Sequence, residues 1–351
     1  MYNQRIARLR EAIDDPLLIT FLPNIRYLTG FTGSSAYVFV SKDRFVFITD
    51  GRYEELGRKL IDAIEGGELV SYRTGLVDVL VEQFADSKRV GLEAQDVNWA
   101  FVHSLKGNTN SDLVPARGVV EALREVKDEG EIESLAAAAR AGDEAFNSIR
   151  EIAASAGSEG EVGWGLVNAM RVAGADQAGW PPIAAAGANA ALPHHLSAGD
   201  PVGVGLLLLD YGCTVNGYHS DMSRTIWLQG EPDAETARMH EAVLESQEAG
   251  IAAVRPGVTG SDVDEACRVV LRKYGYEDYF VHSTGHGVGL EIHEGPRLSV
   301  TSDDVLVPGN VVTVEPGVYV PGFGGVRIED MVVVTEDGRR VLTDSDKGWD
   351  A

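Results

Sequence analysis

The sequence has few cysteines and few basic residues for its length. Only two cysteines occur among 351 residues, Cys213 and Cys267, which is too few for a framework of disulfide bonds. Such sparing use of cysteine is typical of reducing compartments, so we expect a cytoplasmic protein. Lysine and arginine number 30 against 54 aspartates and glutamates, which gives a formal net charge of −24. This balance excludes a nucleic-acid-binding protein, because that function needs clustered cations to neutralise phosphates.

Long hydrophobic runs are also missing. The longest, Val202 to Leu209, has eight residues and ends at Asp210, whereas a membrane-spanning helix needs about 20. The first ten residues have the pattern of an amphipathic helix, without the apolar core and small-residue cleavage site of a secretory signal. We therefore expect neither a membrane segment nor a signal peptide.

What is present fits a globular protein of about two domains, since domains average roughly 150 residues. In the first third, helical patterns alternate with short apolar segments, which predicts an α/β layer domain. The expected strands are 17–21, 36–40, 45–49, 68–70 and 89–92, and the expected helices are 2–13, 53–64, 76–84 and 96–105. A long helical stretch begins near residue 120, so we predict two domains, residues 1–122 and 123–351.

The second predicted domain shows one order of elements twice. A long helical stretch, about 121–155, precedes a shorter one, and strands follow. A second long helix, about 234–254, again precedes a shorter one, and strands follow. Both shorter helices open with the capping pattern S-x-x-[DE], at Ser158 and at Ser261. Two such helix–helix–hairpin halves would bring two hairpins face to face.

Two aspartates flank the first predicted hairpin. Asp210 ends the run Leu206–Leu209, although aspartate is depleted in strands. Asp221 follows eleven residues later, across Asn216-Gly217, a strong signal for a hairpin turn. A two-residue turn would make the aspartates diagonal rather than opposite. In both cases their side chains point to one face of the sheet, with Cβ atoms roughly 5–8 Å apart.

Two glutamates repeat this arrangement. Glu315 ends the run Val311–Val314, and Glu329 follows Val326-Arg327-Ile328. Equal spacing places the tip of this hairpin at Gly322, within a glycine-rich turn. Four carboxylates that converge in a half-buried sheet would be severely destabilising unless protons or cations neutralise them. Divalent metal ions are the most economical explanation.

Histidines cluster near these carboxylates in the sequence. His286 stands in Gly285-His286-Gly287-Val288-Gly289, where glycines let the backbone approach a crowded site. The other histidines in flanking segments are His194, His195, His282 and His293. Each feature alone also has a simple structural explanation, such as a glycine-rich loop, a surface ion pair for Arg327 or a buried Cys213 that fills space. Two like-spaced carboxylate pairs and a glycine-flanked histidine together indicate a metal site.

In these segments the chain resembles the pita-bread metallopeptidases, which include methionine aminopeptidase, Xaa-Pro aminopeptidase and Xaa-Pro dipeptidase (prolidase). The resemblance covers roughly residues 120–345 and rests on Leu209–Gly212, Ser220–Thr225, Gly285–Gly289, Val314–Gly317 and Arg327–Asp330. It implies a creatinase-like α/β domain followed by a pita-bread domain with pseudo-twofold halves. It also implies that two divalent ions are held by Asp210, Asp221, His286, Glu315 and Glu329.

The proline-specific branch of this family is the most similar. The segments that resemble it are Asn24–Phe31, Asn189–His195, Val281–Ser283, Glu315–Tyr319 and Arg327. This implies hydrolysis of the bond before proline at the N-terminus of small peptides. The N-terminal phrases favour an Xaa-Pro aminopeptidase, and a prolidase restricted to dipeptides is the alternative.

The resemblance also implies roles for single residues. Glu315, besides holding metal, would move the proton of the attacking water. His194 and His293 would polarise the scissile carbonyl and stabilise the oxyanion. The residues implied to bind substrate, or to hold those that do, are His282, Tyr319 and Arg327. One histidine among four carboxylates favours Mn(II), with Co(II), Fe(II) or Zn(II) as alternatives.

Two further alternatives stay open, one within the same fold and one from another class. A creatinase-like amidinohydrolase shares this fold and works without metal, and some pita-bread proteins are non-catalytic binding partners. Relatives of both kinds lack an intact ligand set, whereas all five positions are filled here. The family resemblance further implies a homodimer.

Overall fold

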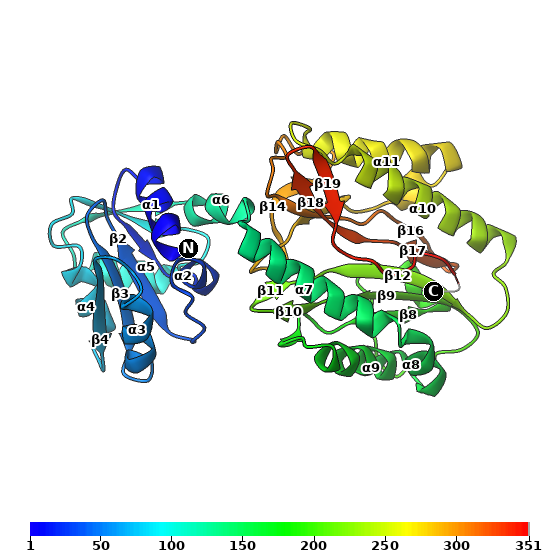
Figure 1. The fold of residues 1–351 in the computed structure, drawn as a ribbon, viewed down its shortest axis with the longest axis horizontal. Helices are drawn as coiled ribbons and strands as arrows, with labels where there is room; N and C mark the ends of the chain where they lie inside the picture. Colours follow the sequence, from blue (N-terminus) through cyan, green and yellow to red (C-terminus); the bar gives the residue numbers. More distant parts are fainter. Residues whose placement is uncertain (350–351) are drawn as a thin grey trace. The chain divides into compact units, whose positions relative to one another are not determined.

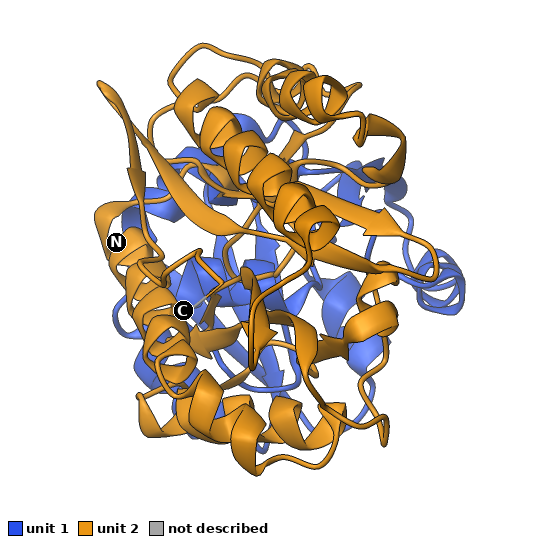
Figure 2. Ribbon diagram, turned by 90° about the vertical axis from the view of Figure 1, so that its right-hand side faces the viewer, with its two compact units in different colours: residues 1–124 blue, residues 125–351 orange. Residues whose placement is uncertain are grey.

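The computed structural model describes residues 1–349, which form two compact units. The first unit comprises Met1–Arg124 and the second begins at Glu125; Figure 2 colours them separately. The predicted boundary falls after residue 122, and the last two residues of the predicted second domain lie outside the described part. Among the described residues, none of the helices has both the length and the apolar character that crossing a membrane requires.

The first unit is a six-stranded mixed sheet with helices in its connections. The strand order is β4-β3-β2-β1-β5-β6, with β1, β2 and β3 antiparallel and the outer pairs parallel. The strands are β1 (Leu17–Ile19), β2 (Ala36–Val40), β3 (Phe45–Asp50), β4 (Gly67–Tyr72), β5 (Arg89–Glu93) and β6 (Asp112–Ala116). The helices are α1 (Tyr2–Ala12), α2 (Leu22–Thr29), α3 (Glu54–Ile61), α4 (Leu76–Glu82), α5 (Trp99–Lys106) and α6 (Val119–Glu125). The expected α/β domain is confirmed.

The second unit repeats an order of helix, helix and hairpin (Figure 1). The elements of its first half are α7 (Glu129–Phe146), α8 (Ile149–Ser155), α9 (Glu159–Val172), β7 (Gln177–Ala178), β8 (Ile183–Ala186), η1 (Gly187–Ala191), β9 (Gly205–Tyr211), β10 (Cys213–Val215), β11 (Tyr218–His219) and β12 (Met222–Leu228). Those of its second half are α10 (Ala234–Ala253), α11 (Gly260–Tyr274), η2 (Glu277–Tyr279), β13 (Gly285–Gly287), β14 (Glu294–Leu298), β15 (Val311–Val314), β16 (Gly317–Val320), β17 (Gly324–Arg327), β18 (Asp330–Thr335) and β19 (Gly338–Val341).

The expected continuous helix over 121–155 is wrong, because the chain breaks it into α6, α7 and α8. Asp128 begins α7 with a capping box, in which its side chain accepts from Glu131 N while the Glu131 side chain accepts from Asp128 N. Asn147 and Ser148 separate α7 from α8. The Asn147 N–H donates to Asp143 O and Ala145 O, and α8 begins after Ser148 without a side-chain cap.

The expected cap at Ser261 is also wrong. Thr259 is the N-cap of α11, and its hydroxyl accepts from the backbone N–H of Asp262. The capping box is therefore shifted by two residues toward the N-terminus. At the other predicted cap, Ser158 accepts from Glu161 N as expected, but the Glu161 carboxylate accepts from Gly157 N.

The four leucines of β9 are buried on both faces of the sheet. Leu207 and Leu209 pack in one core cluster with residues of α7 and α9, while Leu206 and Leu208 pack in another with residues of α10, α11, β15 and β18. This explains the unbroken apolar run, which alternation would otherwise interrupt. Because side chains alternate along a strand, Asp210 shares the face of Leu206 and Leu208, toward the second half.

The first hairpin has the diagonal one of the two registers that the sequence leaves open, and the predicted register of the second is confirmed. Val215 pairs with Tyr218, so Asn216 and Gly217 form a two-residue turn, with φ of 51° and 76°. Asp210 consequently pairs with Ser223, which leaves Asp221 diagonal to it. In the second hairpin the pairs Val314 with Asp330 and Gly317 with Arg327 place Glu315 across from Glu329.

Candidate metal centre

Three of the predicted ligands form one compact group of potential metal-binding atoms. Single ligand atoms of Asp221, His286 and Glu329 all lie within 4.8 Å of one another. Glu315 adjoins this group, since its Oε1 lies 3.4 Å from His286 Nε2, and Asp221 Oδ2 lies 3.5 Å from the same nitrogen. Asp210 is close enough for its negative charge to raise the pKa of Asp221, Glu315 and Glu329. The structure therefore brings together all five residues.

The tautomer of His286 follows from its hydrogen bond. Its Nδ1 lies 3.0 Å from Gly287 O, and a carbonyl can only accept, so Nδ1 carries the proton. Burial lowers the pKa of His286 to about 4, which keeps the ring neutral. The Nε2 lone pair then points between Asp221 and Glu315. Fixing one ring nitrogen so that the other is free to bind is the usual arrangement of a metal-ligating histidine.

The carboxylates lie close together in a buried place, and the nearby cations do not neutralise all of their charge. Burial and then the charge of Glu329 raise the pKa of Asp221 and of Glu315 well above their ordinary values. Burial and then the charge of Asp210 raise the pKa of Glu329 to about 8. Each ionised group opposes the ionisation of the next. A set of this kind needs protons or bound cations to be stable.

Glu329 gives a direct test of whether the residues fit a metal ion. Its Oε2 accepts a hydrogen bond from Ser223 Oγ at 2.8 Å. Its Oε1 is buried, and no hydrogen-bond partner within the described chain reaches it. A buried polar atom without a partner is costly, and a carboxylate oxygen beside an imidazole lone pair is a donor set for a divalent cation. The residues fit such an ion.

Arg327 is a buried residue that organises one side of the site, so its explanation as a surface ion pair is wrong. It is 3% exposed, and its Nη2 donates to Asp210 Oδ2 at 2.6 Å. Its Nη1 donates to Tyr319 Oη at 2.7 Å. His282 Nδ1 donates to Ser283 O, so its Nε2, 2.9 Å from Tyr319 Oη, accepts from that hydroxyl. The predicted substrate-binding residues thus form one hydrogen-bonded chain that ends at Asp210.

His293 and His194 are both exposed, unlike the buried His286. The ring of His293 stands edge-on to that of His286, with centroids 4.5 Å apart. The pKa of His293 is lowered, first by burial and then by Arg297 and His194. His194 also lowers the pKa of His282. Both residues are therefore close enough to His282 and His286 to contact a molecule bound at the same site.

His195, by contrast, has a structural partner. Its Nε2 lies 2.6 Å from Glu159 Oε2, and Glu159 is fully buried. The other oxygen of Glu159 accepts from Ala186 N and Asn189 Nδ2. Glu159 thereby holds the segment that carries His194. Nothing in the sequence marks Glu159, in the first turn of α9, as a buried residue.

The glycines beside His286 are required by close backbone packing. A Cβ atom on Gly285 would lie 2.0 Å from Thr313 O, and one on Gly287 would lie 1.9 Å from Gly295 O. Thr313 in turn accepts from His286 N and donates to Glu315 Oε1. The sequence indicates a crowded backbone here and gives no sign of the part played by Thr313.

Sequence reasoning also misses Ser223 and Arg297. Ser223 donates to Glu329 and accepts from Arg327 Nε at 2.8 Å, so it joins the two hairpins. Arg297 pairs with His286 in the β13–β14 ladder and is exposed. Cross-strand partners share one face of a sheet, and Arg297 lowers the pKa of both His286 and His293. Its backbone N–H donates to Asp304 Oδ2 at 2.9 Å. Arg297 therefore places a cation beside the site histidines.

Comparison with known proteins agrees with this geometry. Residues 133–336 match the model of metallopeptidase family M24, and residues 4–126 match that of the creatinase/prolidase N-terminal domain. The peptidase YqhT of Bacillus subtilis is 40% identical, over 95% of this chain and 94% of its own length.

Two solved structures are similar over almost the whole chain. The Xaa-Pro dipeptidase from Bacillus anthracis is 38% identical with a TM-score of 0.94, covering 99% of both chains. The X-Pro aminopeptidase from Thermotoga maritima is 33% identical with a TM-score of 0.88, covering 97% of this chain and 99% of that one. The expected creatinase-like and pita-bread domains are confirmed. The chain therefore belongs to metallopeptidase family M24, among its Xaa-Pro dipeptidases and aminopeptidases, and is a metal-dependent hydrolase.

Proposed function

We propose that this chain hydrolyses the bond before proline in small peptides with two divalent cations, Mn(II) in preference to Co(II), Fe(II) or Zn(II). The residues that would hold them are Asp210, Asp221, His286, Glu315 and Glu329. The observation that carries the proposal is the buried, unpartnered Oε1 of Glu329 in one group with Asp221 and the lone pair of His286. Four carboxylates and one imidazole suit hard divalent ions.

The cations would lower the pKa of a water molecule and polarise the scissile carbonyl. Glu315 would take the proton of that water, because its carboxylate adjoins the proposed ligands, with Oε1 3.4 Å from His286 Nε2. His293 is neutral near pH 7 because its pKa is lowered, so it presents one N–H donor to the developing oxyanion. His194 would donate to the same carbonyl.

The hydrogen-bonded chain of Arg327, Tyr319 and His282 would orient the substrate. Arg327 holds Asp210 by a bond of 2.6 Å and holds Tyr319 by one of 2.7 Å. Tyr319 fixes the ring of His282, which we place beside the proline ring. An Xaa-Pro bond has no N–H, so recognition of the ring must replace the hydrogen bond that general peptidases make to that group.

Between the two peptidase activities we propose the Xaa-Pro dipeptidase, with the aminopeptidase as the alternative. This reverses the order that the N-terminal phrases favour. The similar structure with the higher identity is named a dipeptidase, and Arg297 is exposed on the side of His286 and His293. A dipeptide carries a carboxylate one residue from the scissile bond, and a guanidinium binds carboxylates by two parallel hydrogen bonds. A longer peptide lacks that carboxylate there.

Activity assays test the proposal directly. The metal-stripped chain is incubated with Ala-Pro and with Ala-Pro-Ala, in the presence and absence of Mn(II). Mn(II)-dependent release of proline from Ala-Pro alone supports the dipeptidase. Comparable cleavage of the tripeptide supports the aminopeptidase. Absence of metal-dependent hydrolysis of both peptides contradicts the proposal.

Arg297→Ala tests whether Arg297 selects dipeptides by binding their terminal carboxylate. We expect kcat/KM for Ala-Pro to fall by about 10- to 100-fold, because a charge-assisted hydrogen bond to a carboxylate contributes roughly 1.5–3 kcal/mol. Cleavage of the amide Ala-Pro-NH2, which lacks the carboxylate, should change little. Arg340→Ala removes another exposed arginine, from β19, and serves as the control. Equal losses for both substrates would contradict the assignment.

A homodimer and a cytoplasmic location remain our predictions. Both cysteines are free and buried, which suits a reducing compartment. Sedimentation of the metal-loaded chain at several concentrations tests the dimer, and a monomer at every concentration would contradict it.

A further inference from the structure

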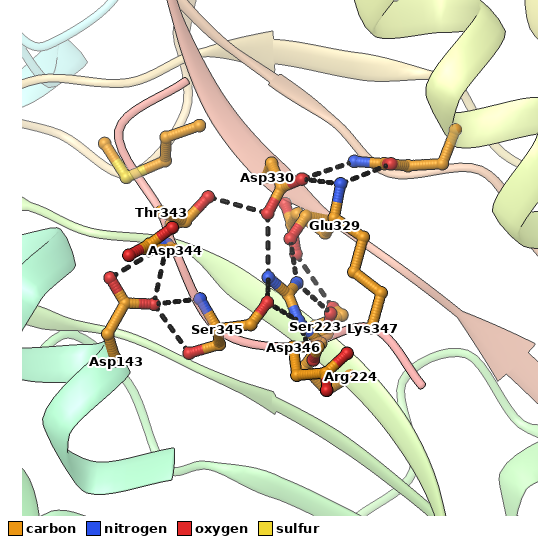
Figure 3. Close-up of polar contacts among 12 residues, drawn as sticks. Asp143, Ser223, Arg224, Glu329, Asp330, Thr343, Asp344, Ser345, Asp346 and Lys347 are labelled. Carbon is orange, nitrogen blue, oxygen red and sulfur yellow. Dashed lines mark hydrogen bonds and ion pairs between the residues drawn. The ribbon is translucent and has the colours of Figure 1, made fainter. Parts of the chain in front are cut away.

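A buried ion pair adjoins the metal centre in the sequence and in space. Arg224 of β12 and Asp330 of β18 are 1% and 0% exposed at the side chain, and Nη2 of the arginine lies 2.8 Å from Oδ1 of the aspartate. Figure 3 shows this pair with the C-terminal segment Thr343–Lys347 packed against it. A buried ion pair is costly unless its remaining polar atoms are also satisfied.

Every N–H group of the Arg224 guanidinium has a hydrogen-bond acceptor. Its Nη2 donates to Asp330 and to Ser345 O, and its Nε donates to Asp346 O at 3.0 Å. Its Nη1 donates to Ser223 O at 2.9 Å and to Glu329 O at 2.5 Å. A guanidinium has five donors, and here five acceptors meet them. One end of the group is held by the C-terminal segment, and the other holds two residues of the site.

Asp330 is held just as fully. Its Oδ1 also accepts from Thr343 Oγ1 at 2.7 Å, and its Oδ2 accepts from Gln247 Nε2 at 2.8 Å and from Lys347 Nζ at 2.5 Å. Four side-chain donors therefore surround this carboxylate.

Asp143 of α7 fixes the C-terminal segment from its other side. Its carboxylate accepts from Asp344 N at 3.0 Å, from Ser345 N at 2.9 Å and from Ser345 Oγ at 2.6 Å. The segment is thus joined to α7, β12 and β18 (Figure 3). Residues from both halves of the second unit are held by one short stretch of chain.

The backbone and one carboxylate oxygen of Glu329 are held by Ser223 and Arg224. Its N–H donates to Ser223 O at 3.1 Å, its C=O accepts from Arg224, and its Oε2 accepts from Ser223 Oγ. Three of its polar groups are therefore fixed by Ser223 and Arg224, and Oε1 alone is left for a ligand. The position of Oε1 depends on the backbone that Arg224 holds.

We propose that the C-terminal segment Thr343–Lys347, acting through the Arg224–Asp330 pair, positions Glu329 and thereby sets the affinity of the site for metal. Arg224, Asp330 and Lys347 are positioning residues, because none of them belongs to the proposed ligand set. This inference rests on the proposed function, in which Glu329 holds metal. Partners of metal ligands typically change affinity by roughly 10- to 100-fold when they are removed.

Lys347→Met tests the inference with little disturbance, because the Lys347 side chain is partly exposed and Arg224 stays in place. Metal-stripped protein is titrated with Co(II), and binding is followed by visible absorption, which reports ligand geometry without turnover. We expect the Kd to rise roughly 10-fold and the absorption band to change. Lys273→Met is the matched control, since Lys273 pairs with Glu245 at the surface at the same kind of distance, 2.8 Å. It should change neither quantity.

Arg224→Lys removes two of the five donors and the planar fork that directs them, and should raise the Kd roughly 100-fold. Arg272→Lys is its surface control. A purely structural role predicts a lower Tm with the Kd and the Co(II) spectrum unchanged, and that result for Lys347→Met would overturn the inference. If Arg224→Lys does not fold, Lys347→Met still decides the question. A wild-type chain that binds no Co(II) would instead overturn the proposed function.

Discussion

Glu315 lies directly across the second hairpin from Glu329, and both face the diagonal pair Asp210 and Asp221 of the first hairpin. The register of two separate hairpins therefore concentrates four carboxylates in one buried place. Their raised pKa values are the electrostatic sign of that arrangement. Stability and function should both depend on what neutralises them.

Removal of metal should make stability depend on pH in a specific direction. The folded pKa of Glu329 is about 8 without metal, whereas an unfolded glutamate titrates near 4.3. The folded state then holds a proton that the unfolded state has lost, so stability falls as the pH rises from about 4.5 to about 8. Each such proton contributes a slope of up to about 1.4 kcal/mol per pH unit. Urea unfolding with EDTA should show this fall, and saturating Mn(II) should remove it.

Asp221→Asn should separate activity from stability. We expect hydrolysis to fall roughly 100-fold or more, because one ligand is lost. The metal-stripped variant should be at least as stable as the wild type, and its advantage should grow toward alkaline pH, because one repelling charge is gone. Asp337→Asn, at an exposed turn, is the control for both measurements. Unchanged turnover in Asp221→Asn would contradict its role in holding metal.

Much of this arrangement could be predicted from the sequence because the hairpins are local. Asn216-Gly217 specifies a two-residue turn, and the spacing about Gly322 specifies the second register. Once the registers are known, the parity of side chains decides which carboxylates share a face. The continuous leucine run before Asp210 likewise indicates a strand buried on both faces.

The parts that could not be predicted depend on contacts between distant segments. The unbroken helix over 121–155 fails at Asp128, where a side-chain cap begins α7, and again after Asn147, where α8 begins without a side-chain cap. Arg327 resembles a surface residue until the fold buries it beside Asp210. The C-terminal segment and Arg224 are about 120 residues apart in the sequence. A periodic pattern of hydrophobic residues cannot predict a contact over that distance.

Gly285→Ala should damage the site by backbone displacement alone. The added methyl group would lie 2.0 Å from Thr313 O, and Thr313 connects the backbone of His286 to the carboxylate of Glu315. We expect a loss of about 1–3 kcal/mol in the free energy of unfolding, as for other overpacked cores, together with weaker Co(II) binding. Gly203→Ala meets open space and should be neutral. Wild-type stability and affinity in Gly285→Ala would show that the backbone can move aside at no cost.

Tyr319→Phe should affect catalysis more than metal binding. The hydroxyl accepts from Arg327 and donates to His282, so its removal costs about 1–3 kcal/mol in unsatisfied hydrogen bonds. We expect kcat/KM to fall by about 10-fold or more, with the Kd for Co(II) near wild type because the Arg327–Asp210 bond remains. Tyr274→Phe removes a surface tyrosine bonded to Glu245 and is the control. A large rise in Kd would instead place Tyr319 among the residues that support the metal.

His240 should make the chain sensitive to mild acid. It is 4% exposed, its ring lies 3.9 Å from that of Trp349, and burial lowers its pKa to about 4 against a weaker effect of a hydrogen bond to the Lys347 backbone. As the pH falls below about 6.5, the unfolded chain binds a proton on His240 that the folded chain does not bind. The free energy of unfolding therefore decreases down to about pH 4, by about 3 kcal/mol at most. His240→Phe should flatten this part of the profile in urea unfolding, whereas His103→Phe, at an exposed position, should not. An equally steep fall in His240→Phe would mean that another group takes up the proton.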